Sequence, residues 1–352
     1  MMRFFLILVL ALAALIAGAV VALQAPTEWT AGDVIQTPDE RFENLEGYPF
    51  APHYVDARGY RVHYVDEGPR DGEVILLMHG QPSWSYLYRH MITDLAAAGY
   101  RVVAPDLVGF GRSDKPLKQS DHSYQMHIDV MTAFVRELDL DGVTLFAQDW
   151  GGLIGLRVVP EAPDRFARIM ISNTGLPAAA GVRGWIGYPL FKLAVWREGT
   201  PTAPAVAGEP FRFTRWVAWA KNVEDFDVGG ILQSASETTL SPGALAAYNA
   251  PFPDEKHKAA IRIFPSLVPS QLRQNQRVMD DFYSAWEKPF ITAFGDSDPV
   301  TRGSEAIFEQ IVPGAQGQSH ATVVGGGHFI QEDRPEELVR LLTAFIENNP
   351  AR

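Results

Sequence analysis

Short apolar runs alternate with segments of helical periodicity through most of the chain. Continuous apolar runs, typical of strands buried in a parallel sheet, occur at residues 74–78, 101–105, 143–147, 169–172, 290–294 and 321–324. Segments with apolar residues at helical spacing lie at 86–98, 124–138, 150–159, 305–311 and 335–346. An alternating pattern at 54–66, broken at Arg58-Gly59, predicts a hairpin before them. Strands that alternate with helices in this way predict a mostly parallel, doubly wound sheet.

This alternation stops between residues 175 and 253. The segment is rich in Trp, Phe and Ala, and its helical stretches are broken by Pro and Gly. An insertion between two strand–helix repeats predicts a helical cap over the carboxyl ends of the strands, where ligands bind in open α/β sheets. We therefore expect an α/β core of residues 37–174 and 254–352, a cap of residues 175–253 and a linker of residues 24–36.

The N-terminus has the length and polarity of a membrane segment. Residues 4–23 carry no charge and follow Arg3, and twenty helical residues span about 30 Å, the thickness of a bilayer core. The length favours an uncleaved signal anchor within residues 1–23, although the small residues 17–19 leave a cleaved signal peptide open. Arg3 on one side and the acidic residues 28–40 on the other predict, by the positive-inside rule, an exported catalytic domain on the periplasmic side, secreted if the segment is cleaved.

Composition narrows the possible partners. The formal net charge is −12 and no basic stripe offsets it, which argues against a nucleic-acid partner. The chain has no cysteine, so disulfides and thiolate metal sites are excluded. Because a helical H-E-x-x-H motif or a clustered His/carboxylate site is also absent from the sequence, we expect no metal and no cofactor. We expect the catalytic domain to be monomeric.

The candidate chemistry centres on Asp149. It follows the strand 143–147 and precedes a helix, with Ala147 two residues before it and Gly151 two residues after it. This is the spacing of a nucleophile elbow, a strand-to-helix turn too tight for large neighbours. A carboxylate at a helix N-terminus is already an anion and can displace a leaving group from saturated carbon, forming an ester. The competing interpretation is a simple N-cap.

A base and an orienting acid follow in the chain. His328 lies in a glycine-rich loop after the last strand, and Asp298 follows the strand 290–294. The order nucleophile, acid, histidine is that of α/β-hydrolases, and all three positions lie beyond strand carboxyl ends. Asp296 is a rival for the acid. His320, in a serine-containing motif, precedes a strand and therefore lies at the wrong edge of the sheet.

The expected donors surround Asp149. His79-Gly80-Gln81-Pro82 ends the first buried strand, where the backbone N–H groups of Gln81 and Trp150 would form an oxyanion hole, with His79 structural. The indole N–H of Trp150 and that of Trp216 in the cap suit a weakly hydrated halide in a dry pocket. A carboxylate substrate would call for Arg instead. The alternative for Trp216 is cap core.

With these features, the sequence resembles a haloalkane dehalogenase of the subfamily with an Asp-His-Asp triad and two halide-binding tryptophans. The resemblance runs from about Thr37 to Leu342. It rests on the segments 37–42, 79–89, 109–116, 148–152, 250–254 and 328–332, which read TPDERF, HGQPSWSYLYR, GFGRSDKP, QDWGG, APFPD and HFIQE.

The resemblance implies an α/β-hydrolase fold and carries roles over by position. Asp149 matches the nucleophile, His328 the base and Asp298 the acid. Trp150 and Trp216 match the halide donors, and the amides of Gln81 and Trp150 the oxyanion hole. The segment 172–174, where another branch places the acid, has no carboxylate. Two departures stand out: Gln81 replaces a frequent Glu, and the looser match in the cap keeps Trp219 as a rival to Trp216.

The implied reaction converts a haloalkane and water to a primary alcohol and halide through an aspartyl ester. An epoxide hydrolase shares the fold and nucleophile but needs paired cap tyrosines, for which Tyr188 and Tyr248 are available. Fluoroacetate-type dehalogenation is disfavoured, because the sequence has no arginine next to Asp149. A non-catalytic, membrane-tethered binding protein on the same scaffold is the remaining alternative.

Overall fold

The structure, a computed structural model, describes residues 33–202 and 211–351. The expected N-terminal membrane segment, most of the linker and residues 203–210 of the expected cap lie outside the described residues. Within the described ranges, no helix combines the length and apolar character needed to cross a membrane.

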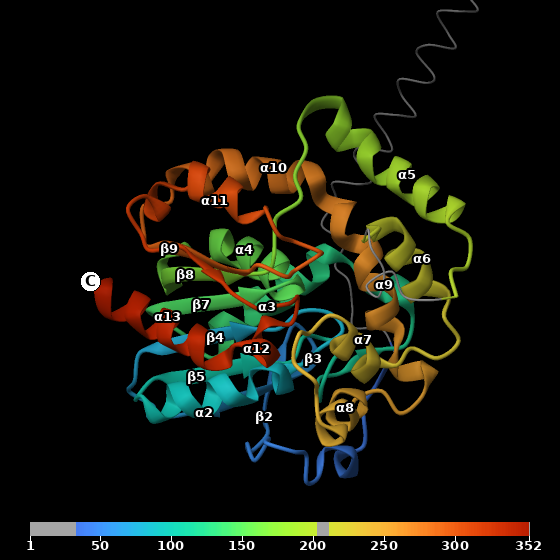
Figure 1. The fold of residues 1–352 in the computed structure, drawn as a ribbon, viewed down its shortest axis with the longest axis horizontal. Helices are drawn as coiled ribbons and strands as arrows, with labels where there is room; N and C mark the ends of the chain where they lie inside the picture. Colours follow the sequence, from blue (N-terminus) through green and yellow to red (C-terminus); the bar gives the residue numbers. More distant parts are fainter. Residues whose placement is uncertain (1–32, 203–210, 352) are drawn as a thin grey trace, which may run out of the picture. The chain divides into compact units, whose positions relative to one another are not determined.

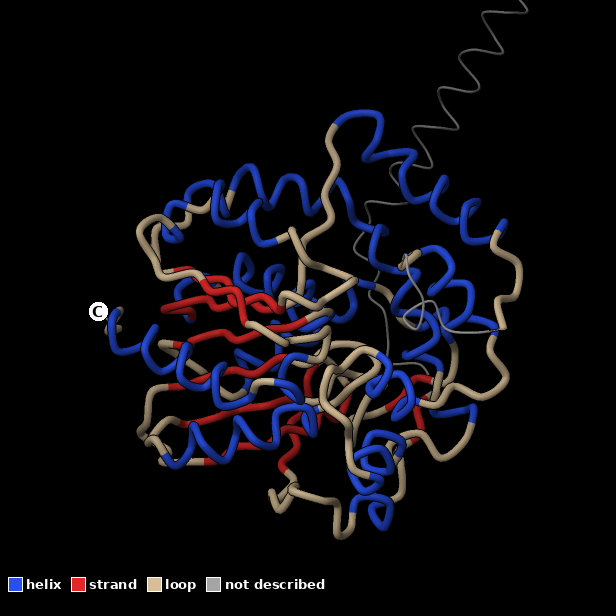
Figure 2. The backbone as a smooth tube through the Cα atoms, viewed as in Figure 1, coloured by secondary structure: helices blue, strands red, loops and turns tan. Residues whose placement is uncertain are grey.

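One large sheet organises the described chain. Its eight strands run in the order β10-β9-β8-β7-β4-β5-β3-β2 (Figures 1 and 2). The strands are β2 (His53–Ala57), β3 (Tyr60–Glu67), β4 (Val74–Met78), β5 (Arg101–Pro105), β7 (Val143–Gln148), β8 (Phe166–Ser172), β9 (Phe290–Gly295) and β10 (Ala321–Val323). The run from β10 to β5 is parallel, whereas β3 pairs antiparallel with both β5 and β2. The mostly parallel sheet predicted from the sequence is confirmed.

The helices cover both faces of this sheet. They are α2 (Arg89–Ala97), α3 (Tyr124–Glu137), α4 (Trp150–Glu161), α11 (Glu305–Ile311), α12 (Ile330–Asp333) and α13 (Pro335–Asn348). The chain passes from β4 to β5 through α2, then reverses past β4 to reach β7 through α3. Because such crossovers are right-handed, the reversal puts α2 and α3 on opposite faces. It also opens a crevice at the carboxyl ends of β4 and β7, the usual ligand site of such sheets.

A helical layer lies over this end of the sheet. Its helices are α5 (Gly181–Arg197), α6 (Phe213–Asn222), α7 (Val228–Ser234), α8 (Pro242–Asn249), α9 (Ala259–Leu267) and α10 (Leu272–Asp281). Figures 1 and 2 show α5 to α9 gathered beyond one end of the strands. Helix α6 packs against α9, which lies past the expected cap boundary at residue 253. Both segments therefore wall the space above the sheet.

Most of the strands and helices expected from local sequence patterns begin and end within a few residues of the observed ones. The hairpin turn falls at Arg58 and Gly59, which both have positive φ. The helix expected at 86–98 begins at Arg89 instead, because Ser85–Tyr88 form a tighter 3-10 turn. In that turn the Tyr88 hydroxyl donates to the carbonyl of Met78, so a tertiary contact shapes the local backbone. A small two-stranded sheet, β1 (Val34–Ile35) with β6 (Lys115–Pro116), was not predicted.

Candidate active site

Asp149 occupies a strained turn between β7 and α4. Its backbone φ of 48° and ψ of −123° lie in a region that L-residues rarely adopt. The neighbours must be small, because a Cβ on Gly151 would stand 1.9 Å from the carbonyl oxygen of Met78 in β4. A Cβ on Gly80 would stand 2.4 Å from Oδ1 of Asp149. The spacing seen in the sequence therefore has a steric cause: the turn is wedged against the end of β4.

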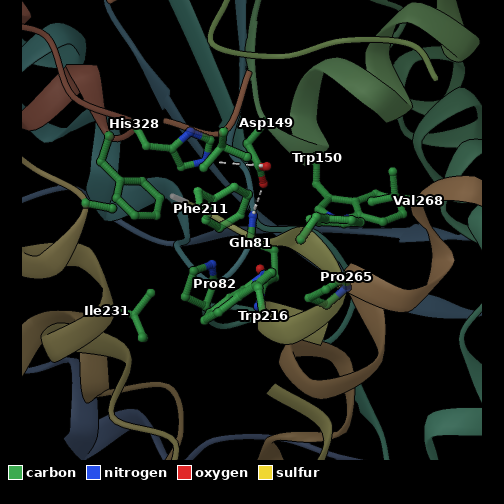
Figure 3. Close-up of a pocket in the computed structure, with 14 residues that line it drawn as sticks. Gln81, Pro82, Asp149, Trp150, Phe211, Trp216, Ile231, Pro265, Val268 and His328 are labelled. Carbon is green, nitrogen blue, oxygen red and sulfur yellow. Dashed lines mark hydrogen bonds and ion pairs between the residues drawn. The ribbon is translucent and has the colours of Figure 1, made fainter. Parts of the chain in front are cut away.

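The structure brings His328 and Asp298 to this carboxylate. His328 Nε2 lies 3.6 Å from Asp149 Oδ2 (Figure 3). On its other side, His328 Nδ1 lies 3.0 Å from Asp298 Oδ1. Asp298 is buried and also accepts hydrogen bonds from the Val300 amide at 2.8 Å and from Thr301. The three side chains thus form one line across the carboxyl ends of β7, β9 and β10.

Two carboxylates set the charge of the imidazole. Burial alone would lower the pKa of His328, but the negative charge of Asp298 and hydrogen bonds with Asp149 and Asp298 raise this pKa to about 10. Burial would likewise raise the pKa of Asp298, yet the charge and hydrogen bond of His328 lower it overall. At neutral pH the resting site therefore holds an imidazolium between two acidic side chains.

Backbone and side chain of Gln81 have separate tasks. Its backbone N–H donates a hydrogen bond to Asp149 Oδ1 at 2.7 Å, so this donor points at the carboxylate (Figure 3). The side-chain amide turns the other way and donates to the carbonyl of Ile261 in α9 at 2.8 Å. A glutamine in place of the more frequent glutamate is therefore compatible with an oxyanion site that uses the backbone N–H alone.

Asp149 opens into a small and mostly apolar cavity. Its volume is about 40 Å³, counted as the space that the centre of a water molecule can reach. This leaves room for a small molecule. Trp150 and Trp216 both line the cavity, and Figure 3 shows Asp149 between His328 and Trp150, with Trp216 across from it. The remaining lining residues are Gln81, Pro82, Phe211, Phe213, Ile231, Ala235, Pro265, Val268, Val300, His328 and Phe329.

Trp216 and Trp219, both on α6, occupy different places. Trp219 stacks on Trp216 with ring centroids 5.2 Å apart and is buried, but only Trp216 of the pair lines the cavity. Trp150 is held between Tyr124 and Phe264, whose ring centroids lie 5.1 and 4.6 Å from its own. The wall around Trp150 and Trp216 is therefore preorganised by aromatic packing.

The rival residues lie elsewhere. Asp296 accepts a hydrogen bond from the Gly325 amide, away from the imidazole. His320 bonds the Ala315 carbonyl and the Thr292 amide. His79 is fully buried and accepts from the Leu107 amide, a structural role. No group of three or more His, Cys, Asp or Glu side chains within residues 33–202 and 211–351 has the arrangement of a metal site.

Two polar residues that sequence reasoning missed hold the histidine loop. Gln148 Nε2 donates to the His328 carbonyl at 3.0 Å, and Asn173 Nδ2 donates to the carbonyls of Gly327 and His328 at 2.7 and 3.1 Å. Asn173 Oδ1 also accepts from the Gly295 amide. The sequence signal that could have identified them is an amide side chain at the carboxyl end of a mostly apolar strand. These residues position the backbone of the His328 loop, and neither lines the cavity.

Comparisons with known proteins agree with this geometry. Residues 73–335 match the family model described as alpha/beta hydrolase fold. A haloalkane dehalogenase of Psychrobacter cryohalolentis is 48% identical over 326 residues, covering 90% of this chain and 99% of the relative. Another from Mycolicibacterium paratuberculosis is 42% identical, covering 89% and 98%. The tetrameric haloalkane dehalogenase DpaA of Paraglaciecola agarilytica superposes with a TM-score of 0.72 at 29% identity, covering 89% of this chain and 97% of that one.

The chain is thus an α/β-hydrolase by fold. Within that class it belongs to the haloalkane dehalogenase family, as its identity to these relatives over nearly their full length shows.

The charge balance at His328 predicts the effect of removing the Asp149 carboxylate. In an Asp149→Asn variant the imidazole loses one of its two carboxylate partners, so its pKa should fall clearly below 10. NMR titration of the imidazole ring would measure the change. Asp296→Asn is the matched control, because that carboxylate does not bond the imidazole, and it should leave the pKa of His328 unchanged. An identical titration in Asp149→Asn and wild type would contradict the assignment.

Proposed function

We propose that this chain hydrolyses haloalkanes to primary alcohols and halide through an ester on Asp149. One observation carries the proposal: a carboxylate joined to an imidazole–carboxylate pair opens into an apolar cavity that two tryptophans line. Water and a small haloalkane are the substrates, and the residues named need no metal or organic cofactor for these steps.

Asp149 performs the displacement. Its carboxylate oxygen attacks the halogen-bearing carbon in line, and the carbon–halogen bond breaks as the carbon–oxygen bond forms. The negative charge moves from Asp149 to the departing halide, which the indole N–H groups of Trp150 and Trp216 receive. An apolar cavity strengthens these hydrogen bonds because little water competes for the ion.

His328 performs the hydrolysis. Once Asp149 is an ester, its charge and hydrogen bond no longer hold the proton on the imidazole, so the pKa of His328 falls and the proton leaves to solvent. The neutral imidazole, still oriented by Asp298, then takes a proton from water, which attacks the ester carbonyl. The Gln81 amide stabilises the developing oxyanion. Release of alcohol restores the carboxylate and imidazolium, and the net products include one proton.

The tyrosines needed by an epoxide hydrolase lie outside the cavity. Tyr248 is fully buried, and its hydroxyl donates to Glu332. Tyr188 lies on α5 beside Lys192. Neither lines the space in front of Asp149, so the donors available there suit a halide and not an epoxide oxygen.

Halide release from 1-bromobutane and 1,2-dibromoethane, with an epoxide panel alongside, tests the proposal. Wild type should release halide, and Asp149→Asn should lose more than about 10³-fold of the rate because the nucleophile is gone. His328→Ala should release about one halide per enzyme and then stop, with the alkyl group visible as added mass on the Asp149 peptide. Sustained turnover by His328→Ala, or hydrolysis of epoxides alone, would refute the mechanism.

The positions of Trp216 and Trp219 predict unequal roles. Trp216→Phe removes an N–H donor to the halide, and a hydrogen bond to a charged group is worth about 1.5–3 kcal/mol, so kcat/KM should fall about 10- to 100-fold. Trp219→Phe keeps an aromatic ring behind Trp216 and should change kcat/KM far less. Steady-state halide release measures both. Equal losses would show that stacking, and not halide binding, explains the effect.

The N-terminal segment supports a proposal about location. Its uncharged length and flanking charges favour export, with residues 4–23 anchoring a monomeric catalytic domain on the periplasmic side. The tetramer described for DpaA makes the oligomeric state a separate matter for measurement.

Cell fractionation tests the location. The full chain should remain with membranes after an alkaline carbonate wash and be degraded by protease added to spheroplasts. A variant lacking residues 1–23 should be found in the cytosol. If the full chain is cytosolic and protected from protease, the proposed export is wrong.

A further inference from the structure

Helix α5 presents an apolar face to solvent. Among the described residues, six of the ten most exposed large apolar side chains belong to this one helix: Val182, Trp185, Ile186, Leu190, Leu193 and Trp196. Their exposed fractions range from 42% for Leu193 to 76% for Trp196, and no residue of α5 is buried. A face of this kind on a single surface helix marks an interaction site.

The pattern on α5 is that of an amphipathic helix. At about 100° per residue, the six side chains fall within about 140° of the helix circumference. The charged residues of the helix are all basic: Arg183, Lys192 and Arg197. Arg183 and Lys192 flank the apolar stripe, whereas Arg197 stands at the last residue of the helix.

Local charge contrasts with the charge of the whole protein. The chain has a formal net charge of −12, yet α5 contributes three positive charges and no acidic side chain. Arg273 of the neighbouring helix α10 adds a fourth, with its guanidinium 3.4 Å from the centre of the Trp185 ring. Tryptophan beside Lys and Arg on an apolar stripe is typical of helices that lie in the headgroup layer of a membrane, where anionic lipids attract the basic residues.

The opposite face of α5 leads to the active site. Phe191 stacks on Phe213 with ring centroids 5.8 Å apart, and Phe213 lines the cavity in front of Asp149. Figure 1 shows α5 as an outer helix of the layer over the strand ends. A surface that contacts α5 therefore lies one aromatic layer away from a wall of the cavity.

The proposed anchor would keep the catalytic domain near lipid. Between residue 23 and the first described strand, ten residues remain, which span at most about 35 Å when extended. Such a short tether holds the whole domain at a high effective concentration at the bilayer surface, so a weak interaction suffices for a face of the domain that binds lipid to dock.

We propose that α5 docks on an anionic lipid surface, with its apolar face in the boundary between headgroups and acyl chains. Apolar haloalkanes that partition into the bilayer would then meet the cavity wall directly. The occupant is lipid because the face combines aromatic, aliphatic and basic side chains without the acidic residues that a symmetric contact between two copies would need to neutralise the basic ones.

A fluorescent label at Val182 tests the docking. The chain has no cysteine, so Val182→Cys in the full chain gives a single site for an environment-sensitive dye. Val324→Cys is the matched control, because Val324 is 73% exposed against 70% for Val182 and lies after β10, far along the chain from α5. On vesicles of phosphatidylcholine with phosphatidylglycerol, the label at 182 should shift to the blue and be quenched by nitroxide lipids, whereas the label at 324 should not.

A charge variant separates lipid attraction from simple stickiness. Arg183→Glu with Lys192→Glu keeps the apolar face and should lose most of the blue shift, and salt should weaken the wild-type signal in the same direction. Flotation with the vesicles shows whether the full chain binds lipid through its anchor, independently of the signal from the label at residue 182. The proposal fails if the protein floats while the label at 182 remains as exposed to water as that at 324. It also fails if this label is shielded before lipid is added, either by the chain itself or, with a dependence on protein concentration, by a second copy.

Discussion

The site depends on one imidazole held between two carboxylates. Asp298 fixes the Nδ1 side of His328 at 3.0 Å, and Asp149 faces its Nε2 at 3.6 Å. In the proposed reaction this arrangement orders the steps, because Asp298 and Asp149 together keep the imidazole protonated until Asp149 becomes an ester. A general base that is active before the ester forms would be of no use to the reaction. The fold serves this contact by ending β7, β9 and β10 at the same edge of one sheet.

The elements that build this edge could be predicted because their physics is local. Strands buried on both faces are largely apolar, so β4, β5, β7, β8 and β9 stand out in the sequence. The elbow is equally visible, since the clash that Gly151 avoids with β4 allows only a small residue there. Chain order then sufficed to bring Asp149, Asp298 and His328 together, because parallel strands share a carboxyl edge.

The parts that escaped prediction depend on packing between distant segments. Trp216 and Trp219 lie three residues apart on one helix and are both buried, so the packing of α6 against the rest of the protein decides which of them faces the cavity. Pro265 and Val268 complete that wall from beyond the expected cap boundary. Gln148 and Asn173 hold the backbone of His328 from two different strands, and a sequence shows amides there without showing what they bond. These contacts depend on how distant loops and helices pack against one another in the folded protein.

Charge conservation explains why indoles suit this cavity better than a cation. In the proposed displacement the site begins with Asp149, the imidazolium of His328 and, behind it, Asp298, and it ends with the halide carrying the charge that Asp149 has lost. The net charge near the substrate is therefore the same on both sides of the step. An arginine beside Asp149 would pair with the carboxylate at rest and weaken its attack, because an ion pair in a dry site is strong. The N–H of an indole is a donor without a formal charge, so it can favour the departing ion without neutralising the nucleophile.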